Sequence, residues 1–202
     1  MAKTAGISPK RARLLNRLVR YLEVDTALEL GTSLGLGTAA MAAGNRVKIT
    51  TIEGCPKTAA IAKEKFEEFN LKNIQLKVGR FEDFLKESAN PKSQIPNPKK
   101  SDGADMESVP THFSILNTHY SLLYIDGNHQ KKATLEYFEN LLPVVHNDSV
   151  MILDDIHWSK GMEEAWEEIK AHPRVKVTID TFQWGLVFFR REQEKQHFVI
   201  RM

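Results

Sequence analysis

The sequence has very little cysteine and no long hydrophobic run. Cys55 is the single cysteine among 202 residues. This excludes an internal disulfide and favours a reducing compartment, so we expect a cytoplasmic protein. No apolar stretch is long enough to cross a bilayer, so we expect no membrane partner.

The first 24 residues also lack the apolar core of a signal peptide. They are arginine-rich and amphipathic, which also fits a mitochondrial presequence. The same pattern runs directly into the first predicted strand, and this favours a helix over residues 8–24 that docks on the surface.

Neither sign of charge dominates the chain. The formal net charge is +2, with 27% charged and 42% hydrophobic residues, as in ordinary globular domains. No strong basic stripe is present, which makes nucleic acid an unlikely partner. A chain of 202 residues can bury one full core. We therefore predict a single domain over residues 1–202.

The sequence does contain four short apolar runs that carry acids at or near their carboxyl ends. These acids are Glu29, Glu53, Asp126 and the pair Asp154-Asp155. Such runs, followed by turn residues, are typical of buried parallel strands. In an open α/β sheet, ligands bind outside the carboxyl ends of the strands. The sequence therefore predicts a binding site at one sheet edge.

Predicted strands and helices alternate regularly along the chain, which indicates a parallel sheet with helices on both faces. The last two strands, Val175–Asp180 and Trp184–Phe189, are joined by a short turn and must pair antiparallel. We predict an α/β fold: a Rossmann-like, doubly wound, mostly parallel seven-stranded sheet with a C-terminal antiparallel β-hairpin. Residues 88–112 are polar and lack apolar periodicity, and we expect a mobile surface insertion there.

A glycine-rich turn follows the first predicted strand. Such a turn before a helix presents backbone N–H groups to a ligand. A dinucleotide-binding turn has glycine where this chain has Ser33, and the similar stretch Gly35–Ala40 begins four residues too late. Glu53 follows Gly31 by 22 residues and can accept both hydroxyls of a ribose, in NAD as in other nucleosides. The alternative is that these glycines serve turn geometry alone.

The spacing of Glu29, Gly31 and Gly35 resembles motif I of class I S-adenosylmethionine-dependent methyltransferases. The resemblance extends from Asp25 through nearly the whole chain, including the closing hairpin. It implies S-adenosylmethionine (SAM) as the cofactor. The residues implied to bind it are Glu29, Gly31, Ser33, Gly35, Glu53, Asp126 and, beside the adenine, Gly79, Arg80 and Phe81.

The second half of the site resembles the metal-assisted O-methyltransferases typified by catechol O-methyltransferase. There an Asp after the fourth strand and an Asp-Asn pair after the fifth hold magnesium, which implies Asp126, Asp154 and Asp155 as ligands here. Neighbouring strands lie about 4.8 Å apart, and carboxylates suit Mg²⁺ or Ca²⁺. A sugar-modifying subgroup has its acidic base where this chain has Asn128, whereas the catechol enzyme has a lysine at the place of His129.

These residues predict methyl transfer to a hydroxyl oxygen of a small-molecule acceptor. A divalent cation would ease loss of the hydroxyl proton. His129, beside Asp126, is the candidate catalytic base, because histidine exchanges protons near neutral pH. His157 is a weaker candidate ligand, which together with His129 would favour Mn²⁺, Fe²⁺ or Zn²⁺.

Structural explanations exist for the same residues. Asp126 can simply lie near the methionine end of the cofactor, as in metal-free relatives. Asn128 can be the N-cap of the helix expected from Gln130, and the Asp154-Asp155 pair can cap or solvate a loop. Trp158 and Trp184 can stack on substrate or pack beneath a loop, and packing is favoured for Trp184.

Two other functions compete with methyl transfer. An NAD-dependent oxidoreductase is disfavoured by Ser33 and by the lack of a Tyr-x-x-x-Lys-type catalytic pair. A non-catalytic cofactor-binding protein is the other alternative, and a nucleic-acid methyltransferase lacks its Asn-Pro-Pro-Tyr-type motif here. One helix alone precedes the first strand, which favours an open site or one completed by a second subunit in a homodimer.

Overall fold

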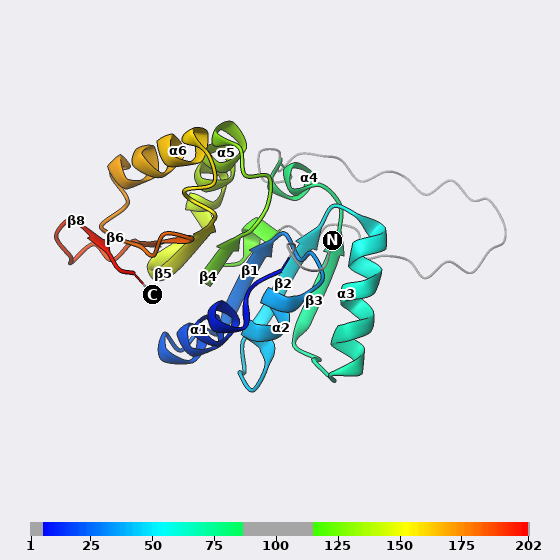
Figure 1. The fold of residues 1–202 in the computed structure, drawn as a ribbon. Helices are drawn as coiled ribbons and strands as arrows, with labels where there is room; N and C mark the ends of the chain where they lie inside the picture. Colours follow the sequence, from blue (N-terminus) through cyan, green and yellow to red (C-terminus); the bar gives the residue numbers. More distant parts are fainter. Residues whose placement is uncertain (1–5, 87–114, 202) are drawn as a thin grey trace, which may run out of the picture.

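The computed structural model describes residues 6–86 and 115–201, so the predicted insertion at 88–112 lies outside the described residues. The described strands form one sheet in the order β3-β2-β1-β4-β5-β7-β6-β8 (Figure 1). The strands are β1 (Thr26–Leu30), β2 (Lys48–Glu53), β3 (Ile74–Val78), β4 (Tyr120–Ile125), β5 (Val145–Asp154), β6 (Val177–Asp180), β7 (Trp184–Phe188) and β8 (Gln196–Val199).

The pairing of these strands confirms the predicted doubly wound, mostly parallel sheet. Strands β1 to β5 pair in parallel, and β7 runs antiparallel to both β5 and β6. The predicted hairpin is therefore formed by β6 and β7, with β7 inserted between β5 and β6.

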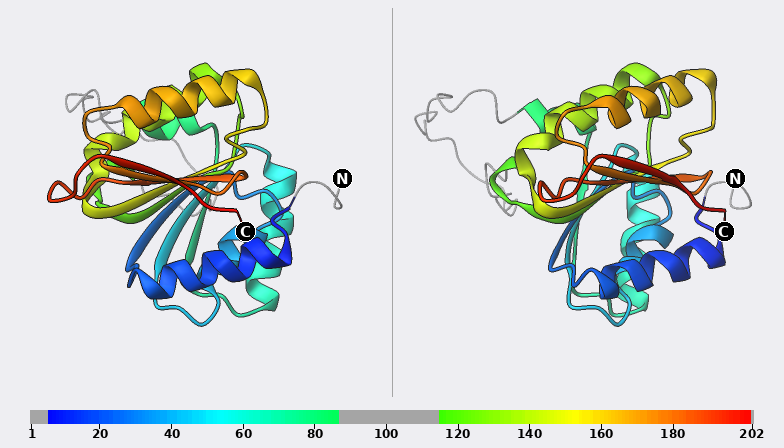
Figure 2. Two further views of the ribbon diagram at one scale, coloured as in Figure 1. Left: turned by 60° about the vertical axis from the view of Figure 1, so that its left-hand side comes forward. Right: turned by 90° about the vertical axis from the view of Figure 1, so that its left-hand side faces the viewer.

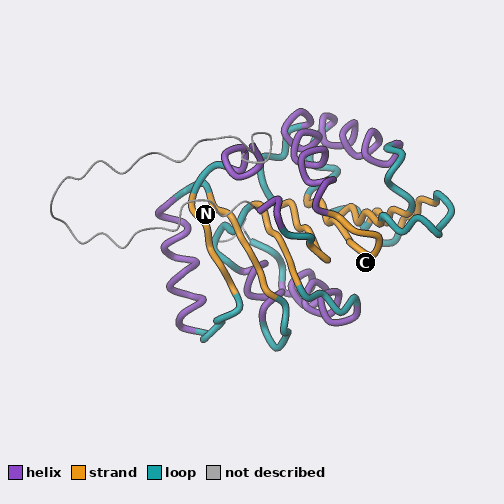
Figure 3. Tube along the Cα trace, turned by 180° about the vertical axis from the view of Figure 1, so that it is seen from behind, coloured by secondary structure: helices purple, strands orange, loops and turns teal. Residues whose placement is uncertain are grey.

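Helices cover both faces of the sheet (Figures 2 and 3). They are α1 (Pro9–Tyr21), α2 (Leu36–Ala42), α3 (Pro56–Glu68), α4 (Phe81–Lys86), α5 (Lys131–Leu141) and α6 (Lys160–Ala171), with short 3-10 helices η2 (Ile115–Asn117) and η3 (Leu142–Val144). Figure 2 shows α1 and α2 on one face and α5 and α6 on the other. Within the described ranges, no helix is long and apolar enough to span a membrane.

The first helix follows from its sequence signals. The Ser8 side chain accepts a hydrogen bond from the backbone N–H of Arg11, and Pro9 occupies the first turn. Leu15 and Val19 lie on one face of α1 and are buried against the sheet. The helix ends at Tyr21, three residues before the predicted limit at 24.

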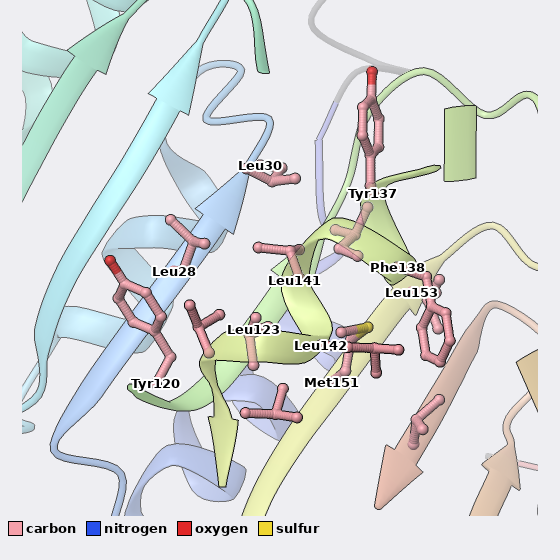
Figure 4. Close-up of a cluster of buried hydrophobic side chains, with 14 of the residues drawn as sticks. Leu28, Leu30, Tyr120, Leu123, Tyr137, Phe138, Leu141, Leu142, Met151 and Leu153 are labelled. Atoms are coloured by element: carbon pink, nitrogen blue, oxygen red, sulfur yellow. The ribbon is translucent and has the colours of Figure 1, made fainter. Parts of the chain in front are cut away.

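Each face of the sheet buries its own hydrophobic cluster. Figure 4 shows one cluster, in which Leu123 and Met151 of the strands pack beside Phe138 and Leu141 of α5. The other cluster joins α1 and α2 to the opposite face and includes the fully buried Trp184. Burying a side chain of leucine size contributes about 1.5–3 kcal/mol, and the two clusters hold the strand ends in a fixed relation.

The sheet has one strand more than the seven predicted. The additional strand, β8, pairs in parallel with β6 at the edge of the sheet. All four residues of β8 are exposed, although the strand ends with the apolar pair Phe198 and Val199. It forms because the backbone of β6 offers it hydrogen-bonding partners.

Candidate functional site

The parallel registers bring the predicted site residues to one edge of the sheet. Ile125 of β4 pairs with both Leu30 of β1 and Leu153 of β5. The residues that follow, Gly31, Asp126 and Asp154, therefore emerge side by side. The backbone N–H of Asp126 also donates to the carbonyl of Leu30 at 2.8 Å. The predicted convergence of the strand ends is thus present.

Two glycines of the turn after β1 are required by space as well as by conformation. Gly31 has φ +106°, and a Cβ atom there would lie 1.9 Å from the backbone oxygen of Asp126. Gly35, the N-cap of α2, has φ +80°, and its Cβ would lie 2.6 Å from the ring of Phe66. A side chain at Gly31 would separate the turn from the loop after β4.

Glu29 lies beneath the glycine turn and is 1% exposed. Its carboxyl group accepts hydrogen bonds from the hydroxyls of Thr38 and Thr51, the latter at 2.6 Å. Burial raises the pKa of Glu29 to about 8. Glu29 therefore supports the floor of the site, and its oxygen also borders the backbone of Gly37.

The raised pKa of Glu29 predicts a specific change of stability with pH. The folded state holds the proton more tightly than the unfolded state, so this stabilisation is full below about pH 4.5 and is lost as pH rises towards about 8. In Glu29→Gln the contribution disappears. Between pH 5 and pH 8, the free energy of unfolding measured with urea should fall by about 2–4 kcal/mol more in wild type than in the variant.

The control for this prediction is Glu67→Gln, because Glu67 is exposed on α3. The variant should reproduce the wild-type profile. Parallel stability profiles for wild type and Glu29→Gln would contradict the prediction.

Glu53 joins the end of β2 to the glycine turn. One carboxylate oxygen, Oε2, accepts the backbone N–H of Ser33 at 2.8 Å, and Oε1 accepts that of Cys55 at 2.9 Å. The backbone carbonyl of Glu53 accepts the N–H of Gly79 at 3.0 Å. Each carboxylate oxygen keeps acceptor capacity for a further hydroxyl donor.

The residues predicted to border the adenine follow β3, and the first of them, Gly79, is bonded to the backbone of Glu53. Arg80 is exposed, and Phe81 is half-buried at the start of α4. The ring of Phe81 meets that of Tyr137 edge to face, with centroids 5.6 Å apart. It also fills the space over Gly127, where a Cβ would lie 2.8 Å from Phe81. Contact of Gly79, Arg80 and Phe81 with an adenine stays a prediction.

A cavity of about 270 Å³ connects the glycine turn with the acids of the second half. Its lining comprises Gly6, Ile7, Arg11, Glu29, Gly31, Thr32, Ser33, Leu34, Leu36, Gly37, Asp126, His129, Asp154 and Asp155. A larger hollow of about 670 Å³ lies between α3 and β3, but none of the predicted site residues line it. The smaller cavity is therefore the candidate site, with Gly6 and Ile7 forming part of its wall.

A buried polar cluster lies at the acidic end of this cavity. Nη1 of Arg11 lies 2.9 Å from Oδ1 of Asp154. The hydroxyl of Tyr124 donates towards Oδ2 of Asp126 at 3.3 Å and Oδ2 of Asp154 at 3.5 Å. Burial raises the pKa of both acids, that of Asp154 to about 7, and the guanidinium of Arg11 opposes this rise.

The remaining acid and the predicted base lie on the loops beside this cluster. Asp155 has φ +52°, and its backbone N–H donates to Oδ1 of Asp154 at 3.0 Å. Nε2 of His129 lies 3.8 Å from Oδ1 of Asp126, and both side chains are about one-quarter exposed. Asn128 donates to the hydroxyl of Tyr137 at 3.1 Å and is not the N-cap of α5, which is Gln130.

The side chains present do not fit the predicted divalent cation. Within residues 6–86 and 115–201, no group of three His, Cys, Asp or Glu side chains is placed to hold a metal ion. A guanidinium already occupies one oxygen of Asp154. His157 turns away from Asp126 and contacts Asp180 at 2.8 Å and Glu163 at 3.3 Å. The expectation that His157 joins His129 and the aspartates is therefore wrong.

Arg11 is not among the predicted site residues, since arginines of an amphipathic surface helix are expected to face away from the sheet. The guanidinium instead points into the site and lies 5.7 Å from the ring centroid of Trp184. A signal was present, because Arg11 precedes Leu15 by four residues and Leu18 by seven and so lies on the same stripe of the helix. Trp184 is completely buried, which confirms its packing role.

Comparisons with known proteins agree with this arrangement. A family model described as "Methyltransferase domain" matches residues 28–156, more than half of the chain. Among curated proteins, the protein-L-isoaspartate O-methyltransferase of Petrotoga mobilis is 44% identical over 66 residues. The match covers 33% of this chain and 30% of that relative's length, so it is local.

Two solved structures share the fold. One is the O-methyltransferase from Bacillus cereus in complex with SAH, with 22% identity, a TM-score of 0.66, and coverage of 92% of this chain and 83% of that chain. The other is the O-methyltransferase TomG from Streptomyces achromogenes, involved in tomaymycin synthesis and in complex with SAM, with 18% identity, a TM-score of 0.67, and coverage of 92% and 82%. The family match and the shared fold confirm the resemblance seen in the sequence: the chain belongs to the methyltransferase-domain family and has the class I fold.

Proposed function

We propose that this protein transfers the methyl group of SAM to a hydroxyl oxygen of a small molecule. The observation that carries the proposal is that the glycine turn lines one side of a cavity whose other side is lined by Asp126, His129 and Asp154. The turn proposed to bind the nucleoside and the groups proposed to accept a proton thus line one cavity. The methyltransferase family and the fold neighbours in complex with SAM and SAH support the choice of cofactor.

The turn and Glu53 would hold the nucleoside half of SAM. The carboxylate of Glu53 is fixed by two backbone N–H groups, so its free lone pairs have defined directions for the two ribose hydroxyls. When bound, SAM supplies a methyl group on a positively charged sulfur. Asp126, which follows β4 and lies beside the start of the turn, would place a carboxyl group near that charge.

The acceptor would bind over β5, β6 and β7, where two large apolar side chains are exposed. Trp158 follows β5 and is 71% exposed, and Phe182 lies between β6 and β7 and is 56% exposed. The ring of Phe182 stacks on His157, with centroids 5.3 Å apart and 19° between the planes. Neither side chain is part of the cavity lining, and exposed apolar groups of this kind favour a partly apolar acceptor.

The chain's own residues can perform the proton transfer. His129 would accept the proton of the acceptor hydroxyl while the oxygen attacks the methyl carbon and the bond from carbon to sulfur breaks. Asp126, 3.8 Å from Nε2 of His129, would stabilise the positive imidazolium. No divalent cation enters this scheme, because Asp154 already pairs with Arg11.

The experiment is a turnover assay with SAM and a panel of hydroxylated small molecules, alongside an isoaspartyl peptide. Formation of a methyl ether together with S-adenosylhomocysteine, detected by mass spectrometry, is the expected result. Methyl ester on the peptide alone would overturn the small-molecule acceptor. Failure to bind SAM together with tight binding of NAD, measured by calorimetry, would overturn the proposal altogether.

Glu53→Gln tests the cofactor half separately. The amide nitrogen would face either the N–H of Ser33 or that of Cys55, so one hydrogen bond becomes a repulsive contact. We expect SAM affinity to fall by about 10- to 100-fold in calorimetric titrations. Glu67→Gln on the exposed face of α3 is the matched control. Unchanged SAM affinity in Glu53→Gln would remove Glu53 from the binding site.

A further inference from the structure

We propose that Arg11 is the built-in cation of this site: a positioning residue that takes the place of a divalent metal ion and prevents one from binding. The proposal rests on the proposed methyl transfer, since it concerns the same cavity. It differs from the sequence-based expectation, in which Asp126, Asp154 and Asp155 share a metal ion.

The carboxylate oxygens of Asp126 and Asp154 lie near groups of the chain, and two of these oxygens share the single hydroxyl proton of Tyr124. Oδ1 of Asp154 accepts from Arg11 at 2.9 Å and from the N–H of Asp155 at 3.0 Å, while its Oδ2 faces the hydroxyl of Tyr124. Oδ2 of Asp126 faces the same hydroxyl, and its Oδ1 faces His129. A metal ion would have to displace several of these contacts to gain its oxygen ligands.

The position of Arg11 is fixed by tertiary packing. Its guanidinium lies over the ring of the buried Trp184, and its side chain is 16% exposed. Its backbone N–H is held by the Ser8 side chain at the start of α1. Its Nε atom is buried and has no hydrogen-bond partner among the described residues. A guanidinium held in this way acts as a permanent positive charge beside Asp154.

The consequence is that removing the guanidinium should create a metal site. In Arg11→Met we expect Asp126, directly after β4, and Asp154, at the end of β5, to keep their positions, while Asp154 loses the guanidinium 2.9 Å away. We expect the affinity for Mn²⁺ alone to rise by about tenfold or more over wild type. The free Mn²⁺ signal in electron paramagnetic resonance titrations measures this without any turnover.

Three variants make the result specific. Arg11→Lys keeps a positive charge and should bind Mn²⁺ as weakly as wild type. Arg17→Met changes an exposed arginine of the same helix and should also behave as wild type. Arg11→Met combined with Asp154→Asn should lose the acquired Mn²⁺ site, and thermal melting should show that each variant is folded.

Two outcomes would overturn the inference. One is a wild-type protein that binds Mn²⁺ as tightly as Arg11→Met. The other is a folded Arg11→Met that gains no Mn²⁺ binding. Both are independent of methyl transfer, so a protein that shows the expected Mn²⁺ result but no turnover would contradict the proposed function alone. Where turnover is found, it should persist in the presence of a chelator.

Discussion

Gly31→Ala is expected to lower the free energy of unfolding by about 2–5 kcal/mol, measured by urea denaturation. Alanine at φ +106° contributes part of this loss. The larger part comes from space, because the new Cβ would lie 1.9 Å from the backbone oxygen of Asp126. Backbone atoms cannot rotate away as a flexible side chain can. The end of β1 and the loop after β4 would therefore have to separate.

The same substitution should abolish SAM binding in protein that remains folded. The turn that carries Ser33 and the loop that carries Asp126 meet at Gly31, and their separation would open the cavity. Gly161→Ala is the matched control. Gly161 lies in α6, has no positive φ, and a Cβ there would make ordinary contacts at 3.5 Å and beyond. That variant should be neutral or up to about 1 kcal/mol more stable. Equal stability of Gly31→Ala and wild type would refute the steric argument.

His129→Ala is expected to reduce kcat by about 10²- to 10⁴-fold, the contribution typical of a general base. SAM affinity should stay nearly unchanged, because the residues proposed to hold its nucleoside are the glycine turn and Glu53, which are bonded to each other. The fall in kcat is expected because His129 borders the cavity, with its Nε2 3.8 Å from Oδ1 of Asp126. Steady-state kinetics at saturating acceptor, paired with calorimetry for SAM, separate the two effects.

His119→Ala provides the control for this measurement. His119 is exposed and precedes β4, at the opposite end of the strand from Asp126. Its replacement should leave kcat unchanged. A His129→Ala protein with wild-type kcat would show that another group takes the hydroxyl proton, and Asp126 would then be the next residue to test.

Much of the fold was predictable because its signals are local. The apolar–polar alternation of Ile74–Val78 and the glycine turn after Leu30 can be identified from a few neighbouring residues. The partnership of Glu53 with the turn also follows from the chain, since parallel strands end at one edge of the sheet. In the structure the glycine turn, Asp126 and Asp154 line one cavity, whereas Glu53 is not part of its lining and contacts the turn through Ser33.

Other features could not be read in this way. Strand β8 has four exposed residues, and it becomes a strand by pairing with β6. Tyr124 has the pattern of an ordinary strand residue, yet its hydroxyl joins Asp126 to Asp154. His157 follows the predicted metal ligands closely in sequence but turns towards Asp180 on β6. Each outcome depends on a partner far away along the chain.

The sequence by itself determined the α/β class, the mostly parallel sheet and the edge at which the acids gather, because strand periodicity and turn residues are local properties. Only the tertiary structure decided how the charges of those acids are balanced. The docking of α1 brings Arg11 to Asp154 across 143 positions of the chain. In the proposed mechanism this contact takes the place of the expected metal ion, because removing either partner would leave a poorly solvated charge uncompensated.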